Sequence, residues 1–251
     1  MDNPFDFSGR RAVVTGAGSG IGRATALLLA EHGASVVGAD LSEAAFTELE
    51  QAGVEALRCD VTRSEDRARL LQAAGEPDHL VNAAGLIRLV PTDDVTEEDW
   101  SAVMDVNAKA LFFMCQTFAR VLPDDGSIVN LSSVAARSAA TPEVSVYAAS
   151  KAAVLSITRS FAYAHGARGL RVNAALPGIV DTPMQDKVLE DVARLRGTTP
   201  EALHKARLKL VPLGRSAPAR ECAEAILFLL SPAASYLTGQ ALGIDGGYVM
   251  F

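Results

Sequence analysis

The stretch that decides the fold is Thr15-Gly-Ala-Gly-Ser-Gly-Ile-Gly22, which lies between a β-branched run and an apolar helical stretch. Glycines let a backbone turn tightly and approach a phosphate, and the first turn of a helix offers unpaired amides to it. The spacing Gly16-x-x-x-Gly20-x-Gly22 differs from G-x-G-x-x-G only in where its glycines stand. The stretch therefore predicts a strand, a phosphate-binding turn and a helix, although a plain turn is the alternative.

An acidic residue at the end of the next predicted strand favours the phosphate-binding interpretation. Asp40 follows Gly22 by eighteen residues, where a carboxylate accepts hydrogen bonds from ribose hydroxyls and repels a 2′-phosphate. Neither Leu41 nor Ser19 offers the cation that a 2′-phosphate needs. We therefore predict NAD rather than NADP as the cofactor; the alternative is that Asp40 is an ordinary exposed strand end.

Outward from this stretch, short β-rich runs alternate with helical patterns along the whole chain. The alternation predicts a single-domain α/β Rossmann fold over residues 1–251, a doubly wound seven-stranded parallel sheet with helices on both faces. The irregular part at about 180–217 is expected to form short helices over the site as a lid. The predicted strands and helices are 11–15, 21–31, 35–39, 57–59, 79–82, 97–120, 127–131, 147–165, 170–174, 219–230 and 241–244.

The composition excludes several classes of protein. Hydrophobic residues make up 49% of the 251 residues and the net charge is −7, which argues against a disordered chain and against a nucleic-acid or membrane-surface role. No apolar window is long enough to span a membrane, and the acidic N-terminus lacks a signal-peptide layout, so we expect a cytoplasmic protein. The three cysteines lack metal-binding spacing, and we predict no metal.

A tyrosine and a lysine stand four residues apart in Val-Tyr-Ala-Ala-Ser-Lys, at Tyr147 and Lys151. On a helix these positions share a face, so the ammonium can stabilise a phenolate. Such a pair can serve as base or acid in alcohol–ketone chemistry. The serine pair Ser132-Ser133 just upstream supplies hydroxyls that can hold a substrate oxygen.

Together these motifs resemble the short-chain dehydrogenase/reductase family over essentially the whole chain. The similarity includes Asn82-Ala-Ala-Gly85, Asp60 in Cys-Asp-Val-Thr, Pro177-Gly-Ile-Val-Asp-Thr182 and a C-terminal Thr238-to-Gly247 segment. The resemblance implies a catalytic tetrad of Asn107, Ser133, Tyr147 and Lys151. The predicted cofactor-binding residues are Gly16, Ser19, Gly20, Ile21, Asp40, Leu41, Asp60, Val61, Asn82, Ala83, Gly85, Tyr147, Lys151, Pro177, Gly178, Ile179 and Thr182.

The resemblance also implies a role for each member of the tetrad. Tyr147 is expected to exchange the proton, Lys151 to stabilise the phenolate and bind the nicotinamide ribose, and Ser133 to hold the substrate oxygen. Asn107 is expected either to satisfy a local kink or to anchor a water of a proton relay. Ser133 precedes Tyr147 by fourteen residues where thirteen is common, so Ser132 stays an alternative to Ser133.

The lid segment resembles a branch of the family that acts on small hydroxy acids and sugar acids. A carboxylate substrate needs a cation, for which Arg88, Arg137 and Arg207 are candidates. That branch carries an arginine shortly before the tyrosine, where this chain has Glu143, Val144 and Ser145, so a neutral polyol, sugar or cyclic alcohol is the rival substrate. The predicted substrate residues are Arg88, Ala135, Val144, Met184 and Arg207.

Three further interpretations compete with an alcohol dehydrogenase. A non-catalytic nucleotide-binding module is expected to lose part of the tetrad, which this chain retains. In the family, acyl-carrier ketoreductases prefer NADP, and enoyl reductases space their tyrosine and lysine further apart.

The apolar tail Tyr248-Val-Met-Phe251 is expected to pack at a subunit interface of a homotetramer, a common assembly in this family.

Overall fold

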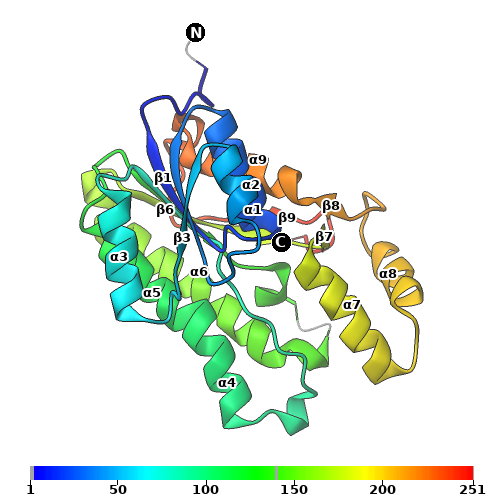
Figure 1. Ribbon diagram of the computed structural model, residues 1–251. Helices are drawn as coiled ribbons and strands as arrows, with labels where there is room; N and C mark the ends of the chain where they lie inside the picture. The colour runs from blue at the N-terminus through cyan, green and yellow to red at the C-terminus, as the bar shows by residue number, and fades with distance from the viewer. Residues whose placement is uncertain (1–2, 139–140, 251) are drawn as a thin grey trace.

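The computed structural model describes residues 3–138 and 141–250, and it confirms the predicted fold class (Figure 1). Seven parallel strands form one sheet in the order β3-β2-β1-β4-β5-β6-β9. A second pair of short strands, β7 and β8, lies outside it. The strands are β1 (Arg11–Thr15), β2 (Ser35–Asp40), β3 (Val54–Arg58), β4 (His79–Asn82), β5 (Ser127–Leu131), β6 (Arg171–Pro177), β7 (Val180–Asp181), β8 (Ala217–Pro218) and β9 (Ala241–Ile244).

Both faces of the sheet are covered, so its central strands β4 and β5 are buried at every position rather than at alternate ones. On one face, Val14 and Val36 pack with residues of α1 (Gly20–Glu31) and α9 (Ala219–Leu230). On the other, Val13 and its neighbours pack with α3, α5 and α6. The remaining helices are α2 (Phe46–Gln51), α3 (Ser64–Ala74), α4 (Glu97–Met104), α5 (Leu111–Ala119), α6 (Ser145–His165), α7 (Pro183–Arg196), α8 (Pro200–Leu208) and short 3₁₀ turns η1 (Thr92–Asp94), η3 (Val134–Ala136), η4 (Pro142–Val144), η5 (Gly166–Arg168) and η6 (Pro232–Ala234).

The single long helix predicted over 97–120 is wrong in its middle. A capping box between Thr96 and Asp99 starts α4, but the six residues of η2 (Asp105–Ala110) form a π-helix before α5 continues. The wider turn carries Asn107, whose side chain is bonded to the loop that follows β4. Apolar periodicity cannot reveal such a turn, because the helix remains continuous on either side of it.

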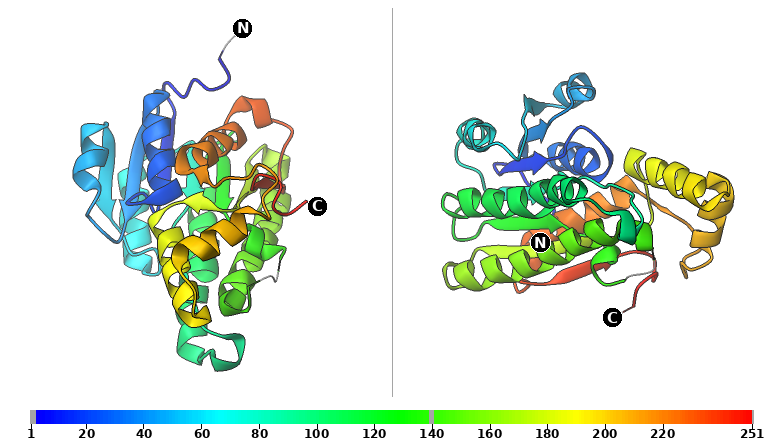
Figure 2. Two further views of the ribbon diagram at one scale, coloured as in Figure 1. Left: turned by 90° about the vertical axis from the view of Figure 1, so that its right-hand side faces the viewer. Right: turned by 90° about the horizontal axis from the view of Figure 1, so that it is seen from below.

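Helices α7 and α8 stand beside the carboxyl edge of the sheet, apart from both helical layers (Figures 1 and 2). Thr182 caps α7, its hydroxyl accepting a hydrogen bond from the Gln185 amide at 3.3 Å, and Gly197 ends the helix in a left-handed conformation. The irregular part predicted at about 180–217 thus contains two helices. The strand order reverses between β1 and β4, and a crevice at such a switch point is where sheets of this kind bind ligands.

Candidate active site

The glycine-rich turn forms a cradle that no side chain could share. A Cβ placed on Gly22 would lie 2.1 Å from the carbonyl oxygen of Gly16, and one on Gly16 would lie 2.7 Å from the Ala84 nitrogen. Helix α1 begins at Gly20, and its N-cap residue Ser19 makes no side-chain capping bond. The first amides of α1 are therefore available to a phosphate group, which such a helix start attracts.

Asp40 lies at the end of β2, against the same turn. Its carboxylate accepts hydrogen bonds from the Gly18 amide and from the Ser42 amide, both at 2.8 Å. The cradle opens into a cavity of about 390 Å³ whose walls contain no lysine or arginine. Eleven of the predicted cofactor residues line it: Gly16, Ser19, Gly20, Ile21, Asp40, Leu41, Asp60, Val61, Ala83, Gly85 and Thr182.

Other predicted cofactor residues lie around this cavity rather than in its wall. Asn82 is buried and donates to the Asn130 side chain at 2.9 Å, which supports the floor between β4 and β5. Ile179 is buried beneath the start of the lid. Pro177 and Gly178 line the second, neighbouring cavity, which shares Ile21, Ala83, Gly85, Leu131, Thr182 and Met184 with the first.

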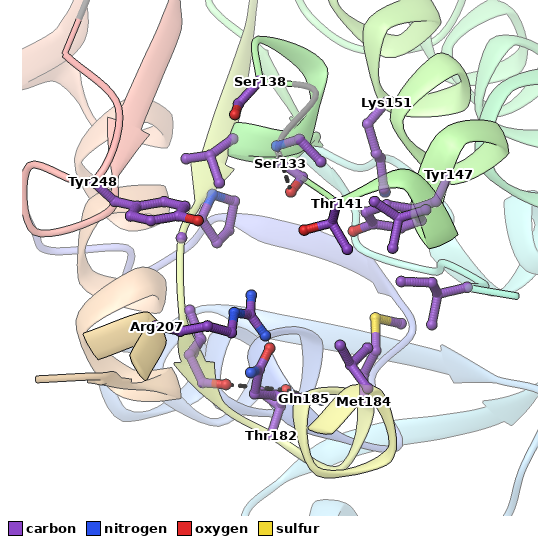
Figure 3. A pocket seen from close by; sticks show the side chains of 18 of the residues that line it. Ser133, Ser138, Thr141, Tyr147, Lys151, Thr182, Met184, Gln185, Arg207 and Tyr248 are labelled. Carbon is purple, nitrogen blue, oxygen red and sulfur yellow. Dashed lines mark hydrogen bonds between the residues drawn. The ribbon is translucent and has the colours of Figure 1, made fainter. Parts of the chain in front are cut away.

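That second cavity, of about 380 Å³, contains the catalytic candidates on α6 and after β5 (Figure 3). Lys151 is 4% exposed, its Nζ donates to the Leu131 carbonyl at 2.8 Å, and it lies 5.6 Å from the centre of the Tyr147 ring. Burial lowers the pKa of Lys151 to about 8. Such a pKa leaves the ammonium mostly charged at neutral pH.

In the protein alone, the surroundings of Tyr147 raise the pKa of its phenol, whereas the spacing to Lys151 had indicated a stabilised phenolate. Burial raises the pKa of Tyr147 to about 12, and hydrogen bonding by Ser133 offsets only part of this rise. The ammonium of Lys151 donates to a carbonyl and lies over the ring rather than lowering the phenol pKa by itself. In the protein alone, desolvation of the phenolate outweighs its neighbours.

The two serines after β5 have different surroundings. Ser132 is buried, and its hydroxyl donates to the Lys151 carbonyl at 2.8 Å, which fixes α6 against the strand end. Ser133 begins η3, where its hydroxyl accepts from the Ala135 amide at 3.1 Å. Its side chain faces the cavity on the same side as Tyr147 (Figure 3). The Ser133 hydroxyl can therefore donate either to Tyr147 or to a bound molecule.

Asn107 is fully buried, and both polar atoms of its side-chain amide have hydrogen-bond partners. Its Oδ1 accepts from the Leu86 amide at 2.8 Å, and its Nδ2 donates to the Leu86 carbonyl at 2.8 Å and to Ser150 Oγ at 2.9 Å. Ser150 in turn donates to the Tyr147 carbonyl at 2.7 Å. The side chain thus connects the π-helix to the loop after β4 and to α6; the water relay stays a prediction.

Four of the five predicted substrate residues line the cavity: Ala135, Val144, Met184 and Arg207. The fifth, Arg88, lies outside it and pairs with Asp99 at 2.9 Å, because the loop after β4 turns toward the start of α4. Arg137 donates to the Ala241 carbonyl at 3.3 Å. Within the described part of the chain, the guanidinium of Arg207 has no hydrogen-bonded or ionic partner. Its pKa is lowered by burial, and further by nearby Arg196.

Sequence reasoning missed several residues of this cavity. Gln185 from α7 points into it near Arg207, and its buried Nε2 has no hydrogen-bond partner in the structure (Figure 3). Tyr248 also lines the cavity (Figure 3), and Phe251 lies outside the described residues. Packing of the tail at a subunit interface stays a prediction. Arg196 also lines the cavity and pairs with Glu143. Among these residues, only Gln185 had a signal in the sequence, namely its position in the first turn of the lid helix.

Metal-ligating clusters and membrane-spanning helices are both absent from the described residues. Over 3–138 and 141–250, no cluster of three metal-ligating side chains occurs, and the three cysteines are buried and unpaired. No helix in those ranges is long and apolar enough to cross a membrane.

The two adjoining cavities contain a glycine cradle, a carboxylate at the second strand and a Ser–Tyr–Lys group. These features together define the class of dinucleotide-dependent oxidoreductases of the Rossmann type. Comparison with known proteins agrees. The sequence model of a family described as "Enoyl-(Acyl carrier protein) reductase" matches residues 16–249. The chain is 39% identical over 254 residues to 3-oxoacyl-[acyl-carrier-protein] reductase FabG of Thermotoga maritima, covering 96% of this chain and 98% of that protein.

Further similarities point to the same family. Dehydrogenase/reductase SDR family member 6 of Rattus norvegicus is 36% identical, with 96% of this chain and 97% of that protein covered. Among solved structures, levodione reductase superposes with a TM-score of 0.90 at 29% identity, covering 96% of this chain and 98% of that chain. The chain belongs to the short-chain dehydrogenase/reductase family, whose members are oxidoreductases that bind a nicotinamide cofactor.

Proposed function

We propose that the protein transfers a hydride between NAD and the carbinol carbon of a small hydroxy acid or sugar acid. One observation carries the proposal. A single cavity has Ser133, Tyr147 and Lys151 on one side, and on the other the free guanidinium of Arg207 and the unbonded amide of Gln185 (Figure 3). A substrate whose carboxylate binds at the side of Arg207 and Gln185 would have its hydroxyl-bearing carbon toward the side of the catalytic groups.

The proton chemistry belongs to three side chains. Ser133 donates a hydrogen bond to the substrate oxygen, where negative charge develops. Tyr147 accepts the hydroxyl proton during oxidation and returns it during reduction. When bound, the nicotinamide ring accepts or supplies the hydride. The positive charge of Lys151, together with the oxidised ring, then opposes the burial that raises the phenol pKa.

The preference for NAD rests on the cradle. Asp40 accepts two amide hydrogen bonds there, which hold its carboxylate at the cradle. A carboxylate at the end of the second strand favours ribose hydroxyls over a 2′-phosphate. Leu41 is 59% exposed and apolar, and no lysine or arginine lines that cavity. A 2′-phosphate would therefore meet a negative charge without a compensating cation.

The preference for an acid rests on Arg207 and Gln185. A buried donor without a partner costs free energy, so the Gln185 amide favours a ligand with acceptor oxygens. The positive charge of Arg207 favours a ligand whose acceptor is an anion. The rest of the cavity wall is largely apolar, including Val144, Val188 and Leu203. A neutral polyol would leave the guanidinium of Arg207 uncompensated, so it is the second candidate.

A substrate screen with a matched variant tests both preferences. Hydroxy acids, sugar acids, polyols and cyclic alcohols are offered with NAD and with NADP, and the absorbance of the reduced cofactor is followed. We expect acids with NAD to give the highest kcat/KM. Arg207→Gln should raise the KM for an acid about 10- to 100-fold and leave that for a neutral alcohol unchanged. Equal effects of Arg207→Gln on the acid and on the neutral alcohol would contradict the acid site.

The homotetramer and the cytoplasmic location stay predictions from the sequence.

A further inference from the structure

The cavity has a second arginine, and that arginine is already neutralised. Arg196, the last residue of α7, donates from Nε to Glu143 Oε1 at 2.9 Å and from Nη2 to Oε2 at 2.7 Å. The Glu143 side chain is only 11% exposed, whereas that of Arg196 is 41% exposed. Two parallel hydrogen bonds to a largely buried carboxylate fix the orientation of the guanidinium.

Glu143 is held in place independently of Arg196. It lies in η4, directly before α6, and its backbone carbonyl accepts from the Val90 amide at 3.0 Å. On the same turn, the Thr92 hydroxyl donates to the Pro142 carbonyl at 2.7 Å. The backbone of Glu143 therefore has a fixed position beside the cavity, and Arg196 reaches the Glu143 carboxylate from the lid.

The two arginines are close enough to influence each other. Both side chains line the cavity, and the charge of Arg196 lowers the pKa of Arg207, after the lowering by burial and the opposing effect of Tyr248. The cluster of Arg196, Arg207 and Glu143 carries two positive charges and one negative charge, a net charge of one. A single carboxylate on the substrate balances it, whereas a second would face Glu143.

We infer that Glu143 is a specificity determinant: by neutralising Arg196, it restricts the cavity to substrates with one carboxylate and disfavours dicarboxylates. The inference rests on the proposed function, because it concerns the acid site of the same cavity. A second carboxylate would find Nε and Nη2 of Arg196 occupied by Glu143, so it could contact this guanidinium mainly through Nη1, beside the negative charge of Glu143.

Two unreactive acids of equal chain length, pentanoate and pentanedioate, test the inference. Their dissociation constants are measured by calorimetric titration of the protein saturated with NAD⁺. The wild-type protein should bind pentanoate more tightly. Glu143→Gln keeps the size of the side chain and removes its charge, and it should shift the ratio of the two constants toward pentanedioate by about tenfold or more.

Variants at Arg196 keep the test decisive even where Glu143→Gln affects folding. Glu143→Gln combined with Arg196→Gln should lose the gain. Arg196→Gln alone leaves the Glu143 charge without its partner, so it should favour pentanoate at least as strongly as the wild-type protein does. A ratio unchanged in Glu143→Gln, or a gain in pentanedioate binding in Arg196→Gln alone, would overturn the inference. Pentanoate binding that Arg207→Gln does not weaken would count against the acid site itself, and so separates the two proposals.

Discussion

The two adjoining cavities are built in opposite ways. The cradle at the start of α1 is made of backbone, and Gly16 and Gly22 leave no room there for a Cβ. The second cavity is made of side chains from α6, α7, α8 and the C-terminal segment, and among the described residues its Gln185 Nε2 donor has no hydrogen-bond partner. The shape of the cradle is thus set by the backbone conformation, whereas the second cavity is defined by side chains that can be substituted one at a time. Substitutions should therefore separate cofactor binding from turnover.

The largest effect is expected at the phenol. Tyr147→Phe removes the group that exchanges the proton and leaves the cradle untouched, so kcat should fall on the order of 10²–10⁴-fold. Affinity for NADH, measured by fluorescence titration, should stay within twofold. Turnover near the wild-type rate would remove Tyr147 from the mechanism.

The complementary change is made in the backbone of the cradle. Gly22→Ala brings a Cβ to 2.1 Å from the Gly16 carbonyl, a distance that only a backbone shift can relieve. We expect affinity for NAD to fall about 100-fold, in keeping with the loss of several phosphate contacts. Gly166→Ala is the matched control, since nothing lies within 4 Å of its added carbon. Equal affinity in both variants would show that the loop tolerates side chains.

A third change lies at the amino end of β4, away from both cavities. Burial lowers the pKa of His79 to about 4, and the ring is hydrogen-bonded to Ser127 at 2.9 Å. The unfolded chain takes up a proton near pH 6.5 whereas the folded protein does not, so stability is present above that pH and is lost as pH falls toward 4. The loss between pH 7.5 and pH 5 should be about 2 kcal/mol by urea unfolding.

His79→Asn should remove that part of the pH dependence without changing NAD affinity or kcat at pH 7.5. A parallel loss of turnover would mean that the amino edge of the sheet also positions the catalytic groups. An unaltered pH dependence would mean that His79 is protonated in the folded protein.

The smallest effect concerns the choice between the two cofactors. Asp40→Asn keeps one acceptor for the neighbouring amides but removes the charge, and we expect the preference for NAD over NADP to narrow about tenfold. The ratio of kcat/KM with the two cofactors measures it. Glu43→Gln, an exposed carboxylate nearby, serves as control and should leave the ratio unchanged.

Local sequence was sufficient for the cradle and for most of the sheet. The predictions for β5, β9 and α9 agree with the structure to the residue, because each has a short apolar pattern with clear ends. The boundaries of β6 and α6 differ by a few residues, since Pro177 still pairs with Ile244 and Ser145 already belongs to the helix. Such ends depend on neighbouring strands and turns that a single segment does not contain.

The second cavity could be predicted only in part. Tyr147 and Lys151 belong to one helix, so their spacing was informative. Arg88 and Arg207 looked equivalent in the sequence, yet one is paired with Asp99 and the other is free. The pairing of Glu143 with Arg196 joins residues 53 positions apart, and no pattern within either segment indicates it. Charge partners of this kind are decided by tertiary packing alone.

The π-helical turn around Asn107 has a consequence for how the gene can change. A π turn holds one more residue than an α turn, so losing a single codon within Asp105–Ala110 could restore regular winding and rotate one flank by about 100°. Either Asn107 would then leave Leu86, or Met114 and Cys115 would turn away from the sheet. A one-residue deletion here would thus force a trade between the catalytic neighbourhood and the core, which makes this short segment a poor place for length variation.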